Sequence, residues 1–256
     1  NLSSTFNALE AARRAGVGRV IFASSNHVTG MYEKDHPYSA IVAGRYEGLD
    51  PTTIPYITTR MPIRPDGPYG IGKAFGEASG RYYSDEHGLS VICIRIGTLN
   101  KQARPTNERQ RATLLSHRDL VQLVSRCIDA PDDLRFSIFY GVSANKWRFW
   151  DIADSRSAIG YEPQDDASGM AIGMSQRRAT RLTTKIGMTA QSVNQPKIAR
   201  VLQIKNSAVV ARTAATGILM ASKPSSTVII TVIIVCSPRT SLDVLPLQRV
   251  LRQALV

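Results

Sequence analysis

Apolar and polar positions follow two different patterns along the first 160 residues of the chain. Short apolar runs predict buried strands over residues 19–24, 89–96 and 136–141. Longer segments of mixed polarity predict helices over residues 4–15, 68–87, 117–129 and near 151–159. Strands that alternate with helices in this way predict an α/β fold with a parallel sheet.

Glycines and one long connection separate these elements. Gly16, Gly88 and Gly160 each follow a predicted helix, at the position where a C-terminal cap belongs. Residues 26–66 are predicted to be a loop, and the stretch 33–63 is long for a connection without structure of its own. Because long loops of this kind usually serve function, we expect this Tyr- and Pro-rich stretch to cover a binding site.

The pattern ends near Ala167. Beyond it, residues 168–256 show no convincing period until the apolar run 227–236. That run is too short to span a bilayer, and its β-branched residues favour a strand or aggregation. We therefore predict a folded domain over residues 1–167 and a tail over residues 168–256 that is disordered or non-native.

Charge separates the same two regions. The whole chain carries a net charge of +12, yet residues 1–167 contain 20 Lys and Arg against 19 Asp and Glu. The tail contains 12 Lys and Arg and a single acidic residue, Asp243. Three interpretations of the tail remain open: an out-of-frame or read-through product, a basic extension that binds nucleic acid or anionic surfaces, and a solvated appendage without a partner. Since its basic residues are scattered and it has no aromatic residue for base stacking, we expect no specific nucleic-acid partner.

Two short motifs carry candidate chemistry. Ser24 and Ser25 follow a buried strand, where α/β folds place their sites. Tyr69 and Lys73 lie four residues apart at the start of a predicted helix, so they share one helical face. A nearby ammonium stabilises a phenolate and lowers the pKa of a tyrosine from its usual value of about 10. This combination is typical of alcohol oxidation beside a nicotinamide.

At these residues the chain resembles the extended short-chain dehydrogenases/reductases, the NAD-dependent epimerase/dehydratase group, and within it most closely the uronate dehydrogenases and related sugar oxidoreductases. The resemblance implies an α/β, Rossmann-like parallel sheet and covers residues 1–167. Its motifs are Phe22-Ala23-Ser24-Ser25-Asn26-His27, Tyr69-Gly70-Ile71-Gly72-Lys73, Arg95-Ile96-Gly97-Thr98, Leu115-Ser116-His117-Arg118-Asp119-Leu120, Gly141-Val142-Ser143-Ala144-Asn145 and Gly160-Tyr161-Glu162-Pro163.

The resemblance implies a catalytic set and a cofactor. Tyr69 is expected to take the proton of the substrate hydroxyl, and Ser25 to orient the substrate oxygen. Lys73 is expected to hold the nicotinamide ribose and to lower the pKa of Tyr69. Tyr69, Lys73 and Ile96 together are expected to contact the cofactor, which is NAD with NADP as the alternative.

The resemblance also implies a sugar site. Asn26 and His27 are at the positions where uronate dehydrogenases touch the sugar, and Thr98 is at the position of a serine in those enzymes. Arg109 has the spacing of the arginine that binds the substrate carboxylate, a task for which a guanidinium is well shaped. Two other arginines compete for this role: Arg104 and Arg111.

Several of these residues also have a structural interpretation. His27 is either a hydrogen-bonded structural histidine or a ligand contact. Ser24 and Asn145 are expected to satisfy local backbone groups. Ser116 is expected to cap the helix 117–129, and a structural role is favoured over a catalytic one for His117. No cluster of His, Cys, Asp and Glu has metal-ligand spacing, so we predict no metal.

The chain departs from the family pattern at its start. A strand, a Gly-x-x-Gly-x-x-Gly turn and a helix normally bind the dinucleotide pyrophosphate, and this sequence has no such run. We therefore expect a sheet truncated at the N-terminus, in which the strand 19–24 has an unpaired edge.

The predicted function is NAD(P)-dependent oxidation of a hydroxyl on a small-molecule sugar or sugar acid. One alternative is a sugar-nucleotide epimerase or dehydratase with tightly bound NAD, and another is an inactive fragment with a basic binding tail. Three cysteines without pairing logic, and no signal peptide or apolar span, predict a cytoplasmic protein with no membrane partner. A homo-oligomer is possible.

Overall fold

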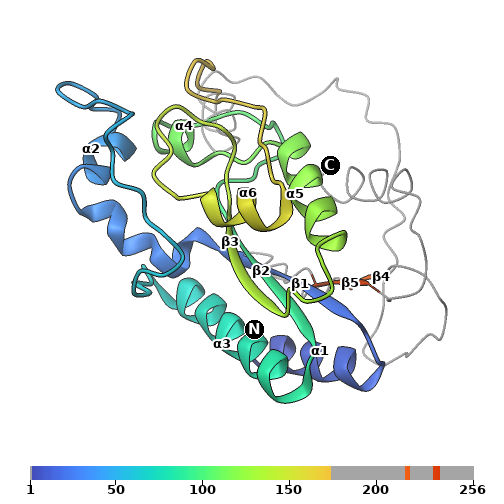
Figure 1. Cartoon of the computed structure of the whole chain (residues 1–256). Coiled ribbons are helices and arrows are strands. Elements are labelled where there is room, and N and C mark those ends of the chain that lie inside the picture. The colour runs from blue at the N-terminus through green and yellow to red at the C-terminus, as the bar shows by residue number, and fades with distance from the viewer. Residues whose placement is uncertain (1, 174–216, 220–232, 237–256) are drawn as a thin grey trace, which may run out of the picture.

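The computed structural model describes residues 2–173, 217–219 and 233–236 (Figure 1). Helices and strands alternate through the first of these ranges, as the apolar pattern predicts. In chain order the elements are α1 (Leu2–Arg14), β1 (Arg19–Ser25), the 3-10 helix η1 (Asn26–Lys34), α2 (Tyr38–Val42), α3 (Pro68–His87), β2 (Ser90–Ile96), α4 (Arg109–Thr113), α5 (His117–Ile128), β3 (Phe136–Gly141), α6 (Ala153–Ile159), β4 (Gly217–Leu219) and β5 (Ile233–Cys236).

The parallel sheet is confirmed for its three long strands. The strand order is β3-β2-β1-β5-β4, and β1, β2 and β3 run parallel. In this register Ser25 lies opposite Ile96, and Ile96 lies opposite Gly141. The carboxyl ends of all three strands therefore meet at one edge, which is where open α/β sheets bind ligands.

Both faces of this sheet are covered, which explains why its strands are continuous apolar runs. Val20, Phe22 and Cys93 pack on one face with residues of α1 and α3. Ile21 and Ile92 belong to a second, larger cluster on the other face, together with residues of α5. Figure 1 shows the same layering, with α1 and α3 on one side of the sheet and α5 and α6 on the other. Neighbouring residues alternate between the two cores because strand side chains point to opposite faces in turn.

The connection 26–66 differs from the loop predicted for it. It contains η1 and α2, and Ile41, Ile54 and Ile57 are buried in the larger core. Its two ends also pair, since the Arg64 amide donates to Val28 O at 3.0 Å. The sequence of this Tyr- and Pro-rich segment shows no helical period. Burial of its three isoleucines against residues distant in the sequence holds the segment in place.

The pairing of β1 also differs from the prediction. It was expected to be unpaired, but β5 pairs with it antiparallel from Arg19 to Phe22. The strand expected within residues 227–236 is confirmed over Ile233–Cys236. Most of the tail 168–256, and with it the prediction of disorder, lies outside the described residues.

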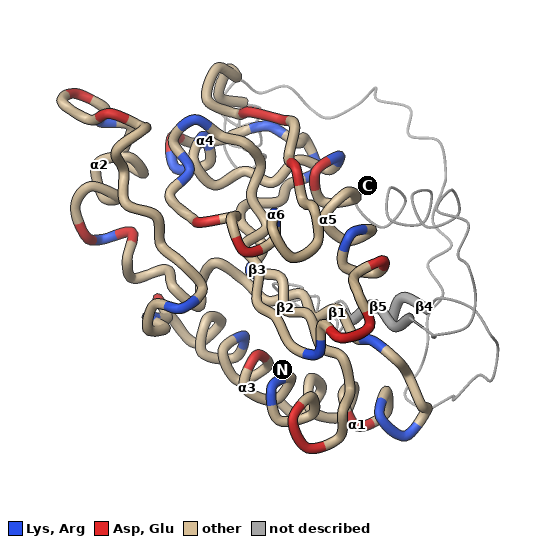
Figure 2. Tube along the Cα trace, in the orientation of Figure 1, with Lys and Arg blue, Asp and Glu red and all other residues tan. Residues whose placement is uncertain are grey.

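The charges, the hydropathy of the helices and the burial of the cysteines add three findings about the described residues. Figure 2 shows Lys and Arg interspersed with Asp and Glu over the described part of the chain. No helix in that part combines the length and the apolar character needed to cross a membrane. Cys93 and Cys127 are both buried.

Candidate active site

Tyr69 and Lys73 lie in the first two turns of α3, as predicted. The helix begins directly after Gly67. Pro68 is the first helical residue, where its fixed φ fits and its missing N–H costs nothing. Gly70 packs directly against His27, which follows β1 in the chain. A Cβ at Gly70 would lie 2.3 Å from His27 O. This close approach brings the first turn of α3 to the end of β1, next to Ser25.

Lys73 points inward rather than at the phenol. Its side chain is 5% exposed, and Nζ donates to Ala23 O at 2.6 Å. Nζ also lies 5.6 Å from the centroid of the Tyr69 ring. Burial lowers the pKa of Lys73 to about 8, because removing an ammonium from water disfavours its charged form.

The pKa of Tyr69 differs from the expectation that Lys73 lowers it. Burial raises this pKa, and a hydrogen bond with Ser25 acts in the opposite direction. The Lys73 ammonium is bonded to the Ala23 carbonyl and not to the phenol. A phenol beside a serine hydroxyl is still placed for proton exchange, since Tyr69 remains 38% exposed at the mouth of the site.

Asn26 and His27 follow Ser25 directly in η1. Ser25 caps this segment by accepting a hydrogen bond from the His27 amide at 3.3 Å. His27 Nδ1 lies 2.6 Å from Asp66 Oδ2, and its ring contacts the Tyr69 ring edge-on with centroids 5.6 Å apart. The Asn26 amide nitrogen is buried without a hydrogen-bond partner among the described residues. A buried donor without a partner is costly, so Asn26 is suited to a ligand acceptor.

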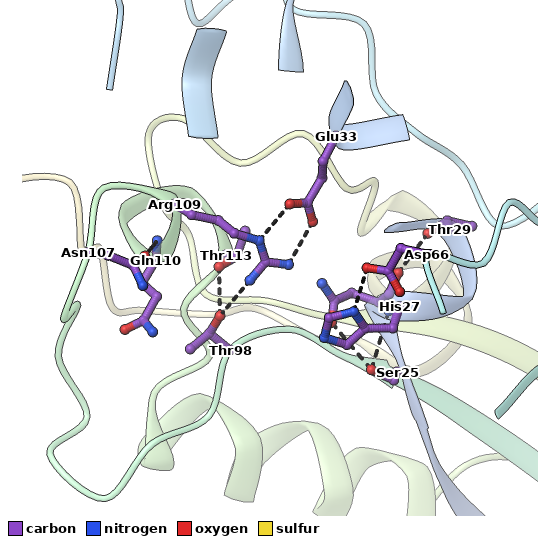
Figure 3. A network of polar contacts seen from close by, with 11 residues as sticks. Ser25, His27, Thr29, Glu33, Asp66, Thr98, Asn107, Arg109, Gln110 and Thr113 are labelled. Carbon is purple, nitrogen blue, oxygen red and sulfur yellow. Dashed lines mark hydrogen bonds and ion pairs between the residues drawn. The ribbon is translucent and has the colours of Figure 1, made fainter. Parts of the chain in front are cut away.

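Thr98 and Arg109 meet across the same end of the sheet. Arg109 Nη1 donates to Thr98 Oγ1 at 3.3 Å, and Thr98 Oγ1 lies 2.8 Å from Thr113 Oγ1. The guanidinium also forms a two-point ion pair with Glu33, at 2.5 and 2.6 Å. Figure 3 shows Arg109 between Glu33 and Thr98, in the same view as Ser25 and His27. Of its two competitors, Arg111 is paired with Glu108 at 3.1 Å, and Arg104 contributes a backbone amide to its loop.

A buried polar network lies beneath the site, and sequence reasoning missed it. Arg95 is 1% exposed and pairs with both carboxylate oxygens of Glu77, at 2.9 and 2.8 Å. Ser24 donates to the same carboxylate at 2.6 Å, so it bonds a side chain rather than the local backbone. Tyr140 extends the network, since Arg95 donates to its hydroxyl at 3.2 Å. Glu77 is four residues after Lys73, so the two residues share one helical face. A second charged residue on that face was the signal from which this network could have been predicted.

The structural interpretations of three other residues hold. Ser116 caps α5 by accepting from the Asp119 amide. His117 Nε2 lies 2.9 Å from Asn100 O. Asn145 orders its loop through bonds to Ala112 O and Leu114 O. The described residues contain no group of three or more His, Cys, Asp or Glu that could hold a metal ion.

Known proteins are similar to this chain in sequence and in fold. Residues 1–118 match the NAD dependent epimerase/dehydratase family. An L-arabinose 1-dehydrogenase (NAD(P)(+)) from Haloferax volcanii is 35% identical over 181 residues, which cover 66% of this chain and 67% of that protein. The chain belongs to the NAD dependent epimerase/dehydratase family.

Other relatives are also sugar dehydrogenases by name. An NAD-dependent glucose-6-phosphate dehydrogenase from Haloferax volcanii is 38% identical, over 66% of this chain and 61% of that protein. A uronate dehydrogenase from Pseudomonas syringae is 37% identical, over 65% of this chain and 52% of that protein. The chain therefore spans between about half and two thirds of the length of these relatives.

Solved structures confirm the Rossmann-like fold. A structure described as a mutated uronate dehydrogenase is 33% identical with a TM-score of 0.53, and the match covers 76% of this chain and 58% of that one. A uronate dehydrogenase mutant from Agrobacterium tumefaciens complexed with NAD is 30% identical with a TM-score of 0.51, over 74% of this chain and 59% of that one.

Proposed function

We propose that this chain carries the proton-transfer and sugar-binding half of an NAD-dependent oxidoreductase that oxidises a hydroxyl group of a sugar. The observation that carries the proposal is Tyr69 beside Ser25, with Lys73 buried one turn along α3. Family membership supports NAD as the cofactor. Two of the relatives match over 167 and 181 residues, which supports residues 1–167 as a partial NAD(P)-binding, Rossmann-like domain with substrate-binding elements.

The residues present fit the nicotinamide end of the cofactor. Lys73 has three N–H donors, and the structure shows one bonded, to Ala23 O, so donors remain for ribose hydroxyls. Ile96 ends β2 directly opposite Ser25 and offers an apolar neighbour. When bound, NAD supplies the acceptor for the hydride that leaves the sugar carbon.

The chain's own residues orient the sugar and move the proton. Ser25 holds the reacting hydroxyl, and Tyr69 takes its proton. Asn26 donates its free amide hydrogens to a sugar oxygen, and His27, fixed by Asp66, borders the same space. Because Tyr69 is at the mouth of the site, the proton can pass on to water.

The test is net NADH formation with a panel of free aldoses and uronic acids. Stoichiometric NADH with at least one sugar supports the proposal. Interconversion of sugars without net NADH would instead indicate an epimerase, which returns the hydride to its substrate.

The proposal also includes the cellular location and the oligomeric state of the protein. The buried thiol of Cys93, which forms no disulfide, supports a cytoplasmic protein, where cysteines stay reduced. Exposed Ile71, Phe75 and Tyr82 on α3, and Phe6 on the neighbouring α1, support a homo-oligomer formed through these helices. Light scattering after gel filtration measures the assembly.

A further inference from the structure

Glu33 and Arg109 form a two-point ion pair among the residues expected to bind the sugar. Both carboxylate oxygens of Glu33 bind Arg109, at 2.5 Å to Nε and 2.6 Å to Nη2. The two side chains are only 13% and 28% exposed. A two-point guanidinium–carboxylate contact in a partly buried setting is a strong one, because less water competes for either ion.

The backbone places this pair beside the residues expected to bind the sugar. Glu33 and His27 belong to the same short segment, η1, which starts directly after Ser25 and is kinked at Thr29 between them. Thr98, the second partner of Arg109, is two residues beyond Ile96, which lies opposite Ser25 in the sheet. Figure 3 shows the pair facing the segment that carries His27.

Glu33 changes what Arg109 is able to recognise. An unpaired arginine would attract a carboxylate or a phosphate on the sugar. Here three N–H donors of Arg109 are already used, two on Glu33 and one on Thr98. An anionic substituent would therefore meet a guanidinium that is already neutralised, and would be repelled by the Glu33 carboxylate.

Carboxylates also hold two of the basic side chains around this site. His27 is bonded to Asp66, and Arg111 is paired with Glu108. Lys73 is turned toward Ala23 O. A neutral sugar, in contrast, offers hydroxyl donors that the remaining lone pairs of Glu33 accept.

We propose that Glu33, through its two-point contact with Arg109, makes this site selective for neutral aldoses over the corresponding uronic acids. This inference rests on the proposed sugar oxidation and defines its substrate class. Glu33 is thus a specificity-determining residue, and Arg109 binds it instead of a substrate carboxylate.

The experiment compares matched sugar pairs that differ only at C6, where the aldose has a hydroxymethyl group and the uronate a carboxylate. In the wild-type chain with NAD, kcat/KM is measured for glucose against glucuronate and for galactose against galacturonate. We expect the neutral sugar to be preferred by about tenfold or more, the scale of one hydrogen bond to a charged group. A wild-type preference for the uronates overturns the proposal, whatever the variants do.

Two variants separate Glu33 from general effects of charge. Glu33→Gln removes the negative charge and frees Arg109, so we expect the aldose-to-uronate ratio to fall by about tenfold to a hundredfold. Glu108→Gln removes a carboxylate that pairs with Arg111 instead, and we expect this ratio to stay unchanged. Equal ratios in wild type and in a folded Glu33→Gln variant, as judged by thermal melting, overturn the proposal.

Sugar binding in the absence of NAD tests the proposed selectivity separately from the proposed oxidation. Saturation-transfer NMR measures the binding of the same four sugars to the chain without NAD. If no sugar yields NADH while glucose still binds better than glucuronate, the oxidation fails and the selectivity stands. If glucuronate binds as well as glucose or better, or if no sugar binds, the selectivity fails.

Discussion

Lys73 donates a 2.6 Å hydrogen bond to the carbonyl oxygen of Ala23, and this bond ties the first turns of α3 to the end of β1. Ala23 precedes the two serines of the site, so one side chain fixes the helix of the base relative to the strand of Ser25. The bond is buried, and burial lowers the pKa of Lys73 to about 8.

This lowered pKa predicts a pH-dependent contribution to stability. Between pH 8 and about 10.5 the unfolded chain keeps a proton on Lys73 that the folded chain has lost. Stability from this group therefore rises with pH across that window, by roughly 3 kcal/mol at most. Urea unfolding of wild type and Lys73→Met from pH 7.5 to 10.5 measures the difference, and a difference that stays constant with pH contradicts the prediction.

Replacement of the proposed base should stop catalysis and leave cofactor binding intact. Tyr69→Phe removes only the hydroxyl, so we expect kcat to fall by about 10²- to 10⁴-fold while NAD affinity is nearly unchanged. Steady-state kinetics and NAD titration measure the two effects. Tyr82→Phe, on an exposed part of the same helix, is the control and should behave as wild type. Undiminished turnover in Tyr69→Phe would rule out the mechanism.

Two glycines of α3 give a matched test of how tightly the helix is docked. A Cβ at Gly70 would lie 2.3 Å from His27 O, whereas a Cβ at Gly72 would meet nothing within 4 Å. We expect Gly70→Ala to cost about 1–3 kcal/mol and to lower kcat, because the first turn that holds Tyr69 must move. Gly72→Ala should stabilise the protein by about 0.5–1 kcal/mol, since alanine favours the helix. Chemical denaturation checks both, and equal effects would contradict the docking.

The buried ion pair beneath the site should matter far more than an exposed pair on the same helix. Glu77→Gln leaves the Arg95 charge buried without a counter-ion, which should cost about 3–5 kcal/mol. Asp85→Asn removes the partner of Arg81 in an exposed pair and should cost less than about 1 kcal/mol. Free energies of unfolding measured in urea compare the two, and similar losses would show that the Glu77–Arg95 pair is not a desolvated contact.

Much of the fold and part of the site could be predicted from local sequence. The three parallel strands and the helices that carry Tyr69 and Ser116 follow from apolar runs, caps and turns, which act within a few residues of each other. Tyr69 and Lys73 share a helical face in the sequence and in the structure for the same reason. The roles assigned to Ser25, Asn26, His27, Thr98 and Arg109 stay predictions.

Contacts between distant segments were beyond the sequence. The helices η1 and α2 form in a segment without a clear period, because Ile41 and Ile57 are buried against the main core. The Glu33–Arg109 contact joins residues 76 positions apart, and Glu77 meets Arg95 across two elements. Burial and Coulomb energy depend on distance in space, so only the tertiary structure decided that Arg109 faces a carboxylate of its own chain. The sequence by itself determined the strands β1, β2 and β3, the helices α1, α3, α5 and α6 and the Tyr–Lys pair, since those depend on neighbours along the chain.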